Sequence, residues 1–198
     1  MNKDKLSDVA LVIESLDTTL DRWITHDSTT ENDKRVETTD TTFSRARILI
    51  ILLRAPDNSF LCDAQADSII EAPPNANTDD VCIGDPLYSP DAKPLTIRHG
   101  VLVIHMEQRC GGSYWKTTYR FRHQEGDWYL IGASAWNGFQ GSPDLEEYDA
   151  NLLTGNVRVG TATMDQPKES FKKIRLHKPP KHRLTDFRSF TLNLSDTK

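Results

Sequence analysis

The regular alternation of apolar and polar residues over residues 95–163 is the feature that most restricts how this chain can fold. In "YWKTTYRFRHQ", Tyr119 and Phe121 alternate with Arg120 and Arg122, as in a strand with one buried face. Turn signals interrupt the pattern at short intervals, at Gly100, Gly111-Gly112, Glu125-Gly126 and Thr154-Gly155. Strands joined by such short turns predict an antiparallel meander.

A second strand region precedes the meander, in "FSRARILIILLRAP". Its apolar run is short and rich in β-branched residues, and the turn signal Pro56-Asp57-Asn58 ends it, so it reads as a central strand buried on both faces. "SFLCDA" would return as its hairpin partner. We therefore predict a mainly β (α+β) fold whose antiparallel sheet is curled into a sandwich or a barrel.

The N-terminal region carries a different period. Its apolar side chains recur at steps of three and four, which predicts an amphipathic helix over residues 5–24. These are Val9, Val12, Ile13, Leu16, Leu20 and Trp23. The stripe could bind a partner, but packing on the domain's own sheet is the reading that we favour. Residues 25–42 are polar, rich in Thr and without periodicity, which predicts a linker.

Length and charge limit the domain organisation. The chain has 198 residues and a net charge of -5, which suits one soluble domain and does not favour a nucleic-acid partner. Acidic residues predominate in residues 1–40 and basic residues in 167–198. We expect a β-rich core over 43–166 and, from Pro167 on, a basic tail that is a solvated surface rather than a phosphate site.

No targeting or membrane segment is evident. The longest apolar run, residues 48–53, is far too short to cross a membrane. Asp8 and Glu14 interrupt the apolar stretch that a signal peptide would need at the N-terminus. Either the protein is cytoplasmic, or this is a mature form whose signal was removed.

The three cysteines, Cys62, Cys82 and Cys110, form no C-x-x-C or other close pair, which argues against a structural zinc site. Cys62 and Cys82 bracket a segment rich in Pro, Asn and Asp, which a disulfide between them could close. The alternative is three reduced and mostly buried thiols, because spacing alone does not fix disulfide geometry.

Candidates for chemistry lie within the meander. A metal site needs several converging ligands, and His99, His105 and His123 lack a carboxylate or a second histidine at ligand spacing. Cys110 or Ser113 with a histidine as base would make a hydrolase-like enzyme. The G-x-S-x-G frame of a nucleophile elbow is absent. We therefore expect no catalytic residue, no metal and no cofactor.

Three tryptophans lie close together in the same strands. Trp115, Trp128 and Trp136 could form an aromatic platform for sugar rings or for a partner protein, or could pair across strands in the core. We expect Trp128, in "DWYLIG", to lie in the core. Trp136 precedes Asn137-Gly138, which is typical of a binding loop beyond a strand end.

These motifs resemble a group of poorly characterised bacterial envelope proteins. The resemblance covers roughly residues 43–160 and rests on "GDP", "LTIRHGVL", "GGSYW", "YRFR", "GDWYLIG" and "NLLTG". It implies an exported, periplasmic or lipoprotein-type β-rich protein, which favours the mature-form explanation of the N-terminus. With it we expect a Cys62–Cys82 bridge and a free Cys110. The family contributes no catalytic residue.

Our leading hypothesis is a non-enzymatic envelope binding protein, specifically an immunity or inhibitor protein that neutralises a secreted toxin or a cell-wall-degrading enzyme. Apolar anchors and acids in the two long loops, 63–94 and 136–147, would suit a basic protein partner. The expected contact residues are Asp79, Asp80, Asp85, Trp136, Asn137, Phe139, Asp144, Glu146 and Glu147. The alternatives are the hydrolase-like enzyme and a carbohydrate- or peptidoglycan-binding module that uses the tryptophans.

Overall fold

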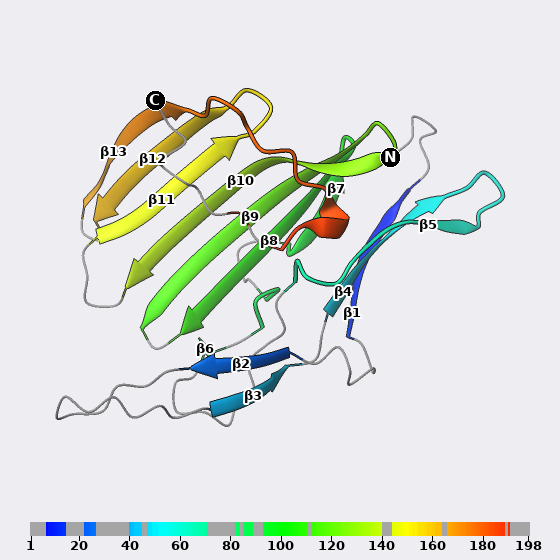
Figure 1. Cartoon of the computed structure of the whole chain (residues 1–198), viewed down its shortest axis with the longest axis horizontal. Coiled ribbons are helices and arrows are strands. Elements are labelled where there is room, and N and C mark those ends of the chain that lie inside the picture. Colours follow the sequence, from blue (N-terminus) through cyan, green and yellow to red (C-terminus); the bar gives the residue numbers. More distant parts are fainter. Residues whose placement is uncertain are drawn as a thin grey trace.

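A computed structural model describes residues 7–14, 22–26, 40–44, 47–70, 82–83, 85–88, 93–110, 112–139, 144–163, 166–188 and 190. For 22–26, 40–44, 82–83, 110, 144–145, 162–163 and 166–170 it describes the backbone alone. The protein is mainly β, and a large twisted sheet dominates it (Figure 1). Two smaller sheets lie beside this sheet.

The large sheet is the predicted antiparallel meander. Each of its six long strands pairs with the next along the chain. They are β8 (Val101–Cys110), β9 (Ser113–Gln124), β10 (Asp127–Phe139), β11 (Asp144–Asn151), β12 (Asn156–Thr163) and β13 (Gln166–Arg175). The short strands β6 (Cys82–Ile83) and β7 (Leu95–Arg98) both pair with the free edge of β8.

Two-residue turns fix the register of the meander. His99 and Gly100 join β7 to β8, and Glu125 and Gly126 join β9 to β10, and all four residues have positive φ. Such turns match the twist of the strands that they connect. Gly155, in the turn between β11 and β12, also has positive φ. A larger residue would not fit there, because a Cβ would lie 2.8 Å from the carbonyl oxygen of Leu176.

The N-terminal helix predicted over residues 5–24 is wrong for the part of that range that the structure describes, since β1 (Val9–Glu14) and β2 (Arg22–His26) are strands. β1 pairs with β4 (Arg47–Arg54), which also pairs with β5 (Phe60–Ala66). Backbone pairing with a buried partner strand overrides the helical spacing in a segment that is also rich in Val and Ile. β4 is central in this small sheet, as predicted. The expected burial on both faces is wrong, because Leu49 and Ile51 are fully buried on one face while Ile48, Ile50 and Leu52 on the other are only partly buried.

The predicted linker and tail also contain strands. β2 pairs with β3 (Asp40–Ser44), and these two strands take up both ends of the 25–42 segment. The strand β13 extends the meander past Pro167, which was expected to end it. β13 is the last strand of the sheet order, and an edge strand tolerates a proline because one side of its backbone makes no ladder hydrogen bonds.

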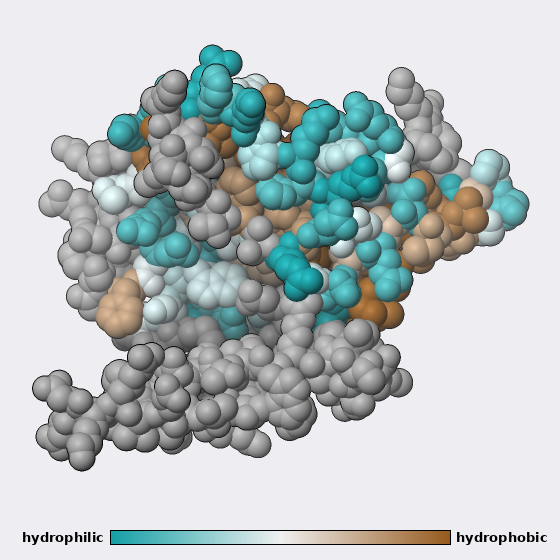
Figure 2. All heavy atoms as spheres, viewed as in Figure 1, coloured by the Kyte–Doolittle hydropathy of each residue, from teal (hydrophilic) through white to brown (hydrophobic). Residues whose placement is uncertain are grey.

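The large sheet is open. Its order runs from β13 to β6, with β7 also on β8, and among the described strands β13 pairs only with β12. Of the two expected forms, a sandwich or a barrel, the closed barrel is therefore wrong. The described residues contain no helix long and apolar enough to cross a membrane. Apolar surface shows at the outer end of β4 and β5 (Figure 2), where Phe60 and Leu61 are 45% and 63% exposed.

One core joins the two main sheets. Leu49 and Ile51 of the small sheet belong to the same buried cluster as Ile104 and Phe121 of the large sheet. Trp128 lies in this core, as predicted, and its Nε1 donates a hydrogen bond of 2.6 Å to Asp63 of β5.

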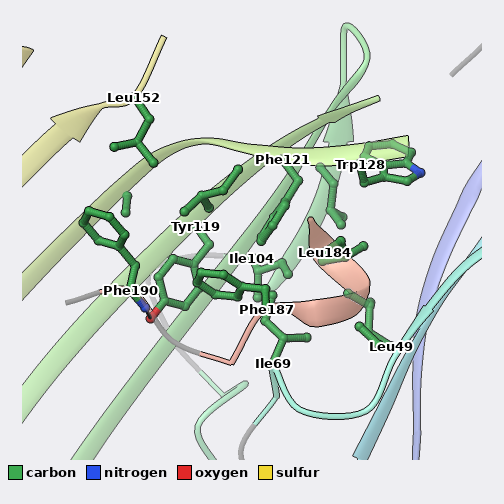
Figure 3. Close-up of a cluster of buried hydrophobic side chains, with 14 of the residues drawn as sticks. Leu49, Ile69, Ile104, Tyr119, Phe121, Trp128, Leu152, Leu184, Phe187 and Phe190 are labelled. Atoms are coloured by element: carbon green, nitrogen blue, oxygen red, sulfur yellow. Dashed lines mark hydrogen bonds between the residues drawn. The ribbon is translucent and has the colours of Figure 1, made fainter. Parts of the chain in front are cut away.

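The C-terminal segment completes this core (Figure 3). Its 3-10 helix η2 (Leu184–Asp186) places Leu184 and Phe187 over the sheet, where the Phe187 ring packs edge-on to Tyr119 at 4.8 Å and to Phe121 at 5.3 Å. The residues just before it pair with β10 where β11 has ended, through a bridge between Tyr129 and Arg183. The segment thus covers one end of the sheet face.

Candidate functional site

The other end of the same sheet face contains a hollow of about 430 Å³. It lies where β9 begins, β10 ends and β11 begins. Its lining combines two aromatic rings, those of Trp115 and Phe139, with an amide, a hydroxyl and a carboxylate. The lining residues are Ser113, Tyr114, Trp115, Asn137, Gly138, Phe139 and Glu146.

Strand register brings these residues together. Ser113 is opposite Phe139, Trp115 is opposite Asn137, and Asn137 is opposite Glu146 on the next strand. Because side chains alternate between the faces of a sheet, Trp115 lies on the same face as Tyr119, four positions along β9. Tyr119 is buried in the core. The hollow is therefore a continuation of the face that carries the core.

The side chains at the rim suit a ligand with both apolar and polar parts. Phe139 is 54% exposed, although large aromatic side chains are mostly buried. Glu146 and Asn137 are also exposed and supply a carboxylate and an amide beside the rings. Aromatic faces next to a carboxylate favour a Lys or Arg side chain, and next to an amide they also suit a sugar ring.

Behind the hollow, on the opposite sheet face, Tyr114 anchors a polar cluster. The rings of Tyr114 and Trp136 meet edge-on at 5.1 Å. Arg109 and Lys116 lie over the Tyr114 ring at 4.8 and 5.3 Å. The Tyr114 hydroxyl donates to Glu107, and burial together with this bond raises the pKa of Tyr114. The cluster holds the back wall of the hollow in place.

The structure divides the expected contact residues between the two faces. Asn137, Phe139 and Glu146 line the hollow, whereas Trp136 and Glu147 are on the opposite face by strand alternation. Most of the expected 136–147 loop is strand, because β10 continues to Phe139 and β11 begins at Asp144.

Asp85 has a structural partner. Both of its carboxylate oxygens accept hydrogen bonds from the buried Arg47 guanidinium, at 2.6 and 2.7 Å, and Arg47 also contacts Glu14 at 3.2 Å. These bonds, above all the hydrogen bond from Arg47, lower the pKa of Asp85. Asp85 therefore ties the small sheet to the turn beside β8. Asp79 and Asp80 lie outside the described residues, and for Asp144 only the backbone is described.

The opposite sheet face is rich in basic side chains, by the same alternation. The basic residues on it are Arg98, Arg109, Lys116, Arg120, Arg122, Arg158, Lys173 and Arg175, and the acidic ones are Glu107, Asp127, Glu147 and Asp149. A basic partner would thus meet less repulsion at the hollow than at this face.

The histidines of the meander are far from the two candidate nucleophiles. The Nδ1 atom of His105 is 2.9 Å from the Thr118 hydroxyl, and burial lowers the pKa of His105. His105 lies five positions from Cys110 along β8, about 16 Å at the rise of a strand.

The other two histidines are also far from these nucleophiles. His123 is at the far end of β9 from Ser113, where its Nε2 lies 3.7 Å from Asp63. His99 is in the turn before β8. Among the described residues no three His, Cys, Asp or Glu side chains form a metal-ligand group.

The expected Cys62–Cys82 disulfide is wrong. Cys62 is an exposed free thiol on β5 of the small sheet, and its Sγ lies 3.9 Å from the Ala64 carbonyl oxygen. Cys82 lies on β6 at the edge of the large sheet. The two cysteines belong to different sheets, so the loop between them is not closed at Cys62.

Sequence reasoning missed Tyr114 and Gly138 as lining residues, and it considered Ser113 and Trp115 for other roles. The Glu125–Gly126 turn is the sequence signal that could have located them, because strands that pair across it place the start of β9 opposite the end of β10. Comparisons with protein-family models, curated proteins and solved structures find no match to this chain. The resemblance to bacterial envelope proteins therefore stays a prediction.

Proposed function

We propose that this chain is a non-enzymatic binding protein that holds a basic protein partner at the hollow. Its specific form would be an immunity or inhibitor protein of the bacterial envelope that neutralises a secreted toxin or a cell-wall-degrading enzyme. The observation that carries the proposal is the convergence of Asn137, Phe139 and Glu146 on one hollow. These three were expected to contact a partner, and they come from two strands.

The chemistry of the hollow supports a basic side chain as its occupant. A Lys or Arg side chain could pack its methylene groups against Trp115 and Phe139 and place its charge beside Glu146. Contacts that combine an aromatic anchor with one desolvated charge often dominate the binding energy of a protein interface. The basic opposite face would help to orient such a partner by repulsion.

An inhibition assay tests the proposal. The purified chain would be added to a basic muramidase, a basic amidase and a basic endopeptidase, each acting on a suspension of cell walls whose turbidity is followed. We expect slower clearing with at least one enzyme, and calorimetry should then give its Kd. If none of the three enzymes is slowed or bound, the inhibitor function is wrong.

Charge reversal on one strand locates the surface. Glu146→Lys should weaken binding at least tenfold, since it places a positive charge in the hollow. Asp149→Lys is the matched control, because Asp149 is three residues further along β11 and on the opposite face. Equal losses for both variants would indicate general electrostatic attraction and not a contact at the hollow.

A carbohydrate-binding module is the second candidate. Trp115 directly opposite Asn137, with Glu146 next to it, is a combination that also suits a sugar ring. Titration with a peptidoglycan disaccharide fragment, followed by tryptophan fluorescence, distinguishes the two. A saturable change that Trp115→Ala removes, without inhibition of the enzymes, would favour the carbohydrate module.

A further inference from the structure

We propose that Cys82 and Cys110 form a cross-strand disulfide that fixes the edge of the large sheet beside the hollow. The inference stands on backbone register and does not depend on the proposed function. β6 pairs with β8 in an antiparallel ladder, and in that ladder Cys82 is directly opposite Cys110.

The register meets the backbone requirement for a disulfide. Directly opposite residues of an antiparallel pair have Cα atoms about 4.5 or 5.5 Å apart, depending on their place in the ladder. Disulfides join Cα atoms that are about 4.4 to 6.8 Å apart. Both ladder positions therefore lie within the range that a disulfide spans.

The third cysteine is placed where it does not compete. Cys62 lies on the small sheet opposite Leu52, and its thiol is free and exposed. Of the two other cysteines in the chain, Cys110 is the one that the register places across from Cys82. The pairing thus leaves Cys62, and not Cys110, as the free thiol.

The location gives the bond a consequence for the hollow. Cys110 is also paired with Ser113 across the next hairpin, and Ser113 lines the hollow. β6 is a strand of only two residues at the sheet edge, so its ladder contributes little pairing of its own. A covalent bond there would hold the segment that leads to the Asp85 turn against β8.

Formation of the bond is a two-electron oxidation, and glutathione disulfide is an oxidant of the required class. One protein thiolate attacks glutathione disulfide, which gives a mixed disulfide and releases one glutathione thiolate. The second protein thiolate then displaces the other glutathione. Two protein thiols are oxidised to one disulfide, and one glutathione disulfide is reduced to two glutathione molecules.

Peptide mapping of the full chain tests the pairing. The protein would be equilibrated with excess glutathione disulfide, quenched in acid, alkylated with N-ethylmaleimide and digested without reduction. We expect the Cys82 peptide to be linked to the Cys110 peptide, and Cys62 to carry either the alkyl group or one glutathione, because its exposed thiol has no protein thiol to displace a bound glutathione. A link that includes Cys62, or three alkylated or glutathionylated cysteines, would overturn the proposal.

Melting with and without reductant provides a second readout. Reduction should lower the Tm of the wild type and of the control Cys62→Ser by about 5 to 10 °C, because the bond closes a loop of about 30 residues. Cys82→Ser and Cys110→Ser should not respond to reductant. The same response in all four proteins, or none in the wild type, would contradict a Cys82–Cys110 bond.

Discussion

The two ends of one face of the large sheet have the same strand pattern and different surroundings. At one end Tyr119 and Phe121 are buried beneath Phe187 of the C-terminal segment. At the other end Trp115 and Phe139 line a hollow. Both ends carry aromatic side chains, so residue type alone does not distinguish a stabilising cluster from a binding surface. The path of the C-terminal segment makes the difference.

The C-terminal segment covers one of these ends because part of the β10 edge is free to pair with it. β11 stops pairing with β10 at Gly132, and the backbone N–H of Leu130 then donates to the carbonyl of His182 at 2.9 Å. This contact directs the chain across the core, where Leu184 and Phe187 become buried. We therefore expect substitutions at the covered end to change stability and substitutions at the open end to change binding.

The largest expected effect is at Phe187, which is 2% exposed and packs against two aromatic rings. Phe187→Ala leaves a cavity in the core and should lower the free energy of unfolding by about 3 to 5 kcal/mol. Urea unfolding followed by fluorescence measures the loss. A loss below about 1 kcal/mol would mean that the C-terminal segment does not seal the core.

The next effect is at the ion pair that ties the small sheet to the large one. Arg47 is 7% exposed and Asp85 39%, so Asp85→Asn leaves a buried guanidinium with weaker compensation. We expect a loss of about 2 kcal/mol, below the range for a fully buried pair because solvent reaches Asp85. Unfolding in urea at neutral pH measures it, and Asp57→Asn at an exposed turn is the control.

The same pair predicts a pH dependence. Since the folded state lowers the pKa of Asp85, its contribution is fully present above the ordinary carboxyl pKa of 3.8 and is lost as the pH falls through the lowered folded value. The difference in stability between the wild type and Asp85→Asn should therefore shrink in acid. A difference that stays constant below pH 3.8 would contradict this assignment.

A smaller effect is expected at Tyr148, on the boundary between the two ends. Its hydroxyl donates to the carbonyl of Phe190 at 3.1 Å, and burial raises the pKa of Tyr148. Tyr148→Phe removes one hydrogen bond and leaves a carbonyl without that donor, which should cost about 1 kcal/mol. Thermal melting measures the change. If it equals that of Phe187→Ala, the boundary residue belongs to the covered core.

Much of the fold could be predicted because the signals are local. The two-residue turns and the alternation of Tyr119 and Phe121 with arginines specify the meander directly. The helix expected at the N-terminus was wrong because Val9, Val12 and Ile13 fit both periods, and only the distant partner β4 decides between them.

The face of Trp136 was not predicted, because a bulge intervenes. Counting from the Glu125–Gly126 turn without a bulge places Trp136 opposite Trp115, on the hollow face. The register shifts between Leu130 and Gly132, so that Asn137 takes this place and Trp136 lies on the opposite face. A single extra residue thus exchanges the two faces for the rest of the strand, and the isolated Gly132 in "LIGAS" is a local signal for such a bulge that the prediction did not use.

The smallest expected effect on stability is at Phe139 in the open end. Substitution by alanine at Phe187 should lower stability, whereas at Phe139 it should mainly weaken binding. Phe139 is 54% exposed, so Phe139→Ala should change the free energy of unfolding by less than about 1 kcal/mol. If the hollow holds a partner, the Kd for an enzyme that the wild type inhibits should rise at least tenfold, because an aromatic anchor is lost. Leu153→Ala, at a 52% exposed apolar residue in the turn between β11 and β12, should change neither quantity. Urea unfolding and calorimetry on the wild type, Phe139→Ala and Leu153→Ala measure both quantities. A stability loss in Phe139→Ala as large as that in Phe187→Ala, with binding unchanged, would mean that the open end is a second part of the core.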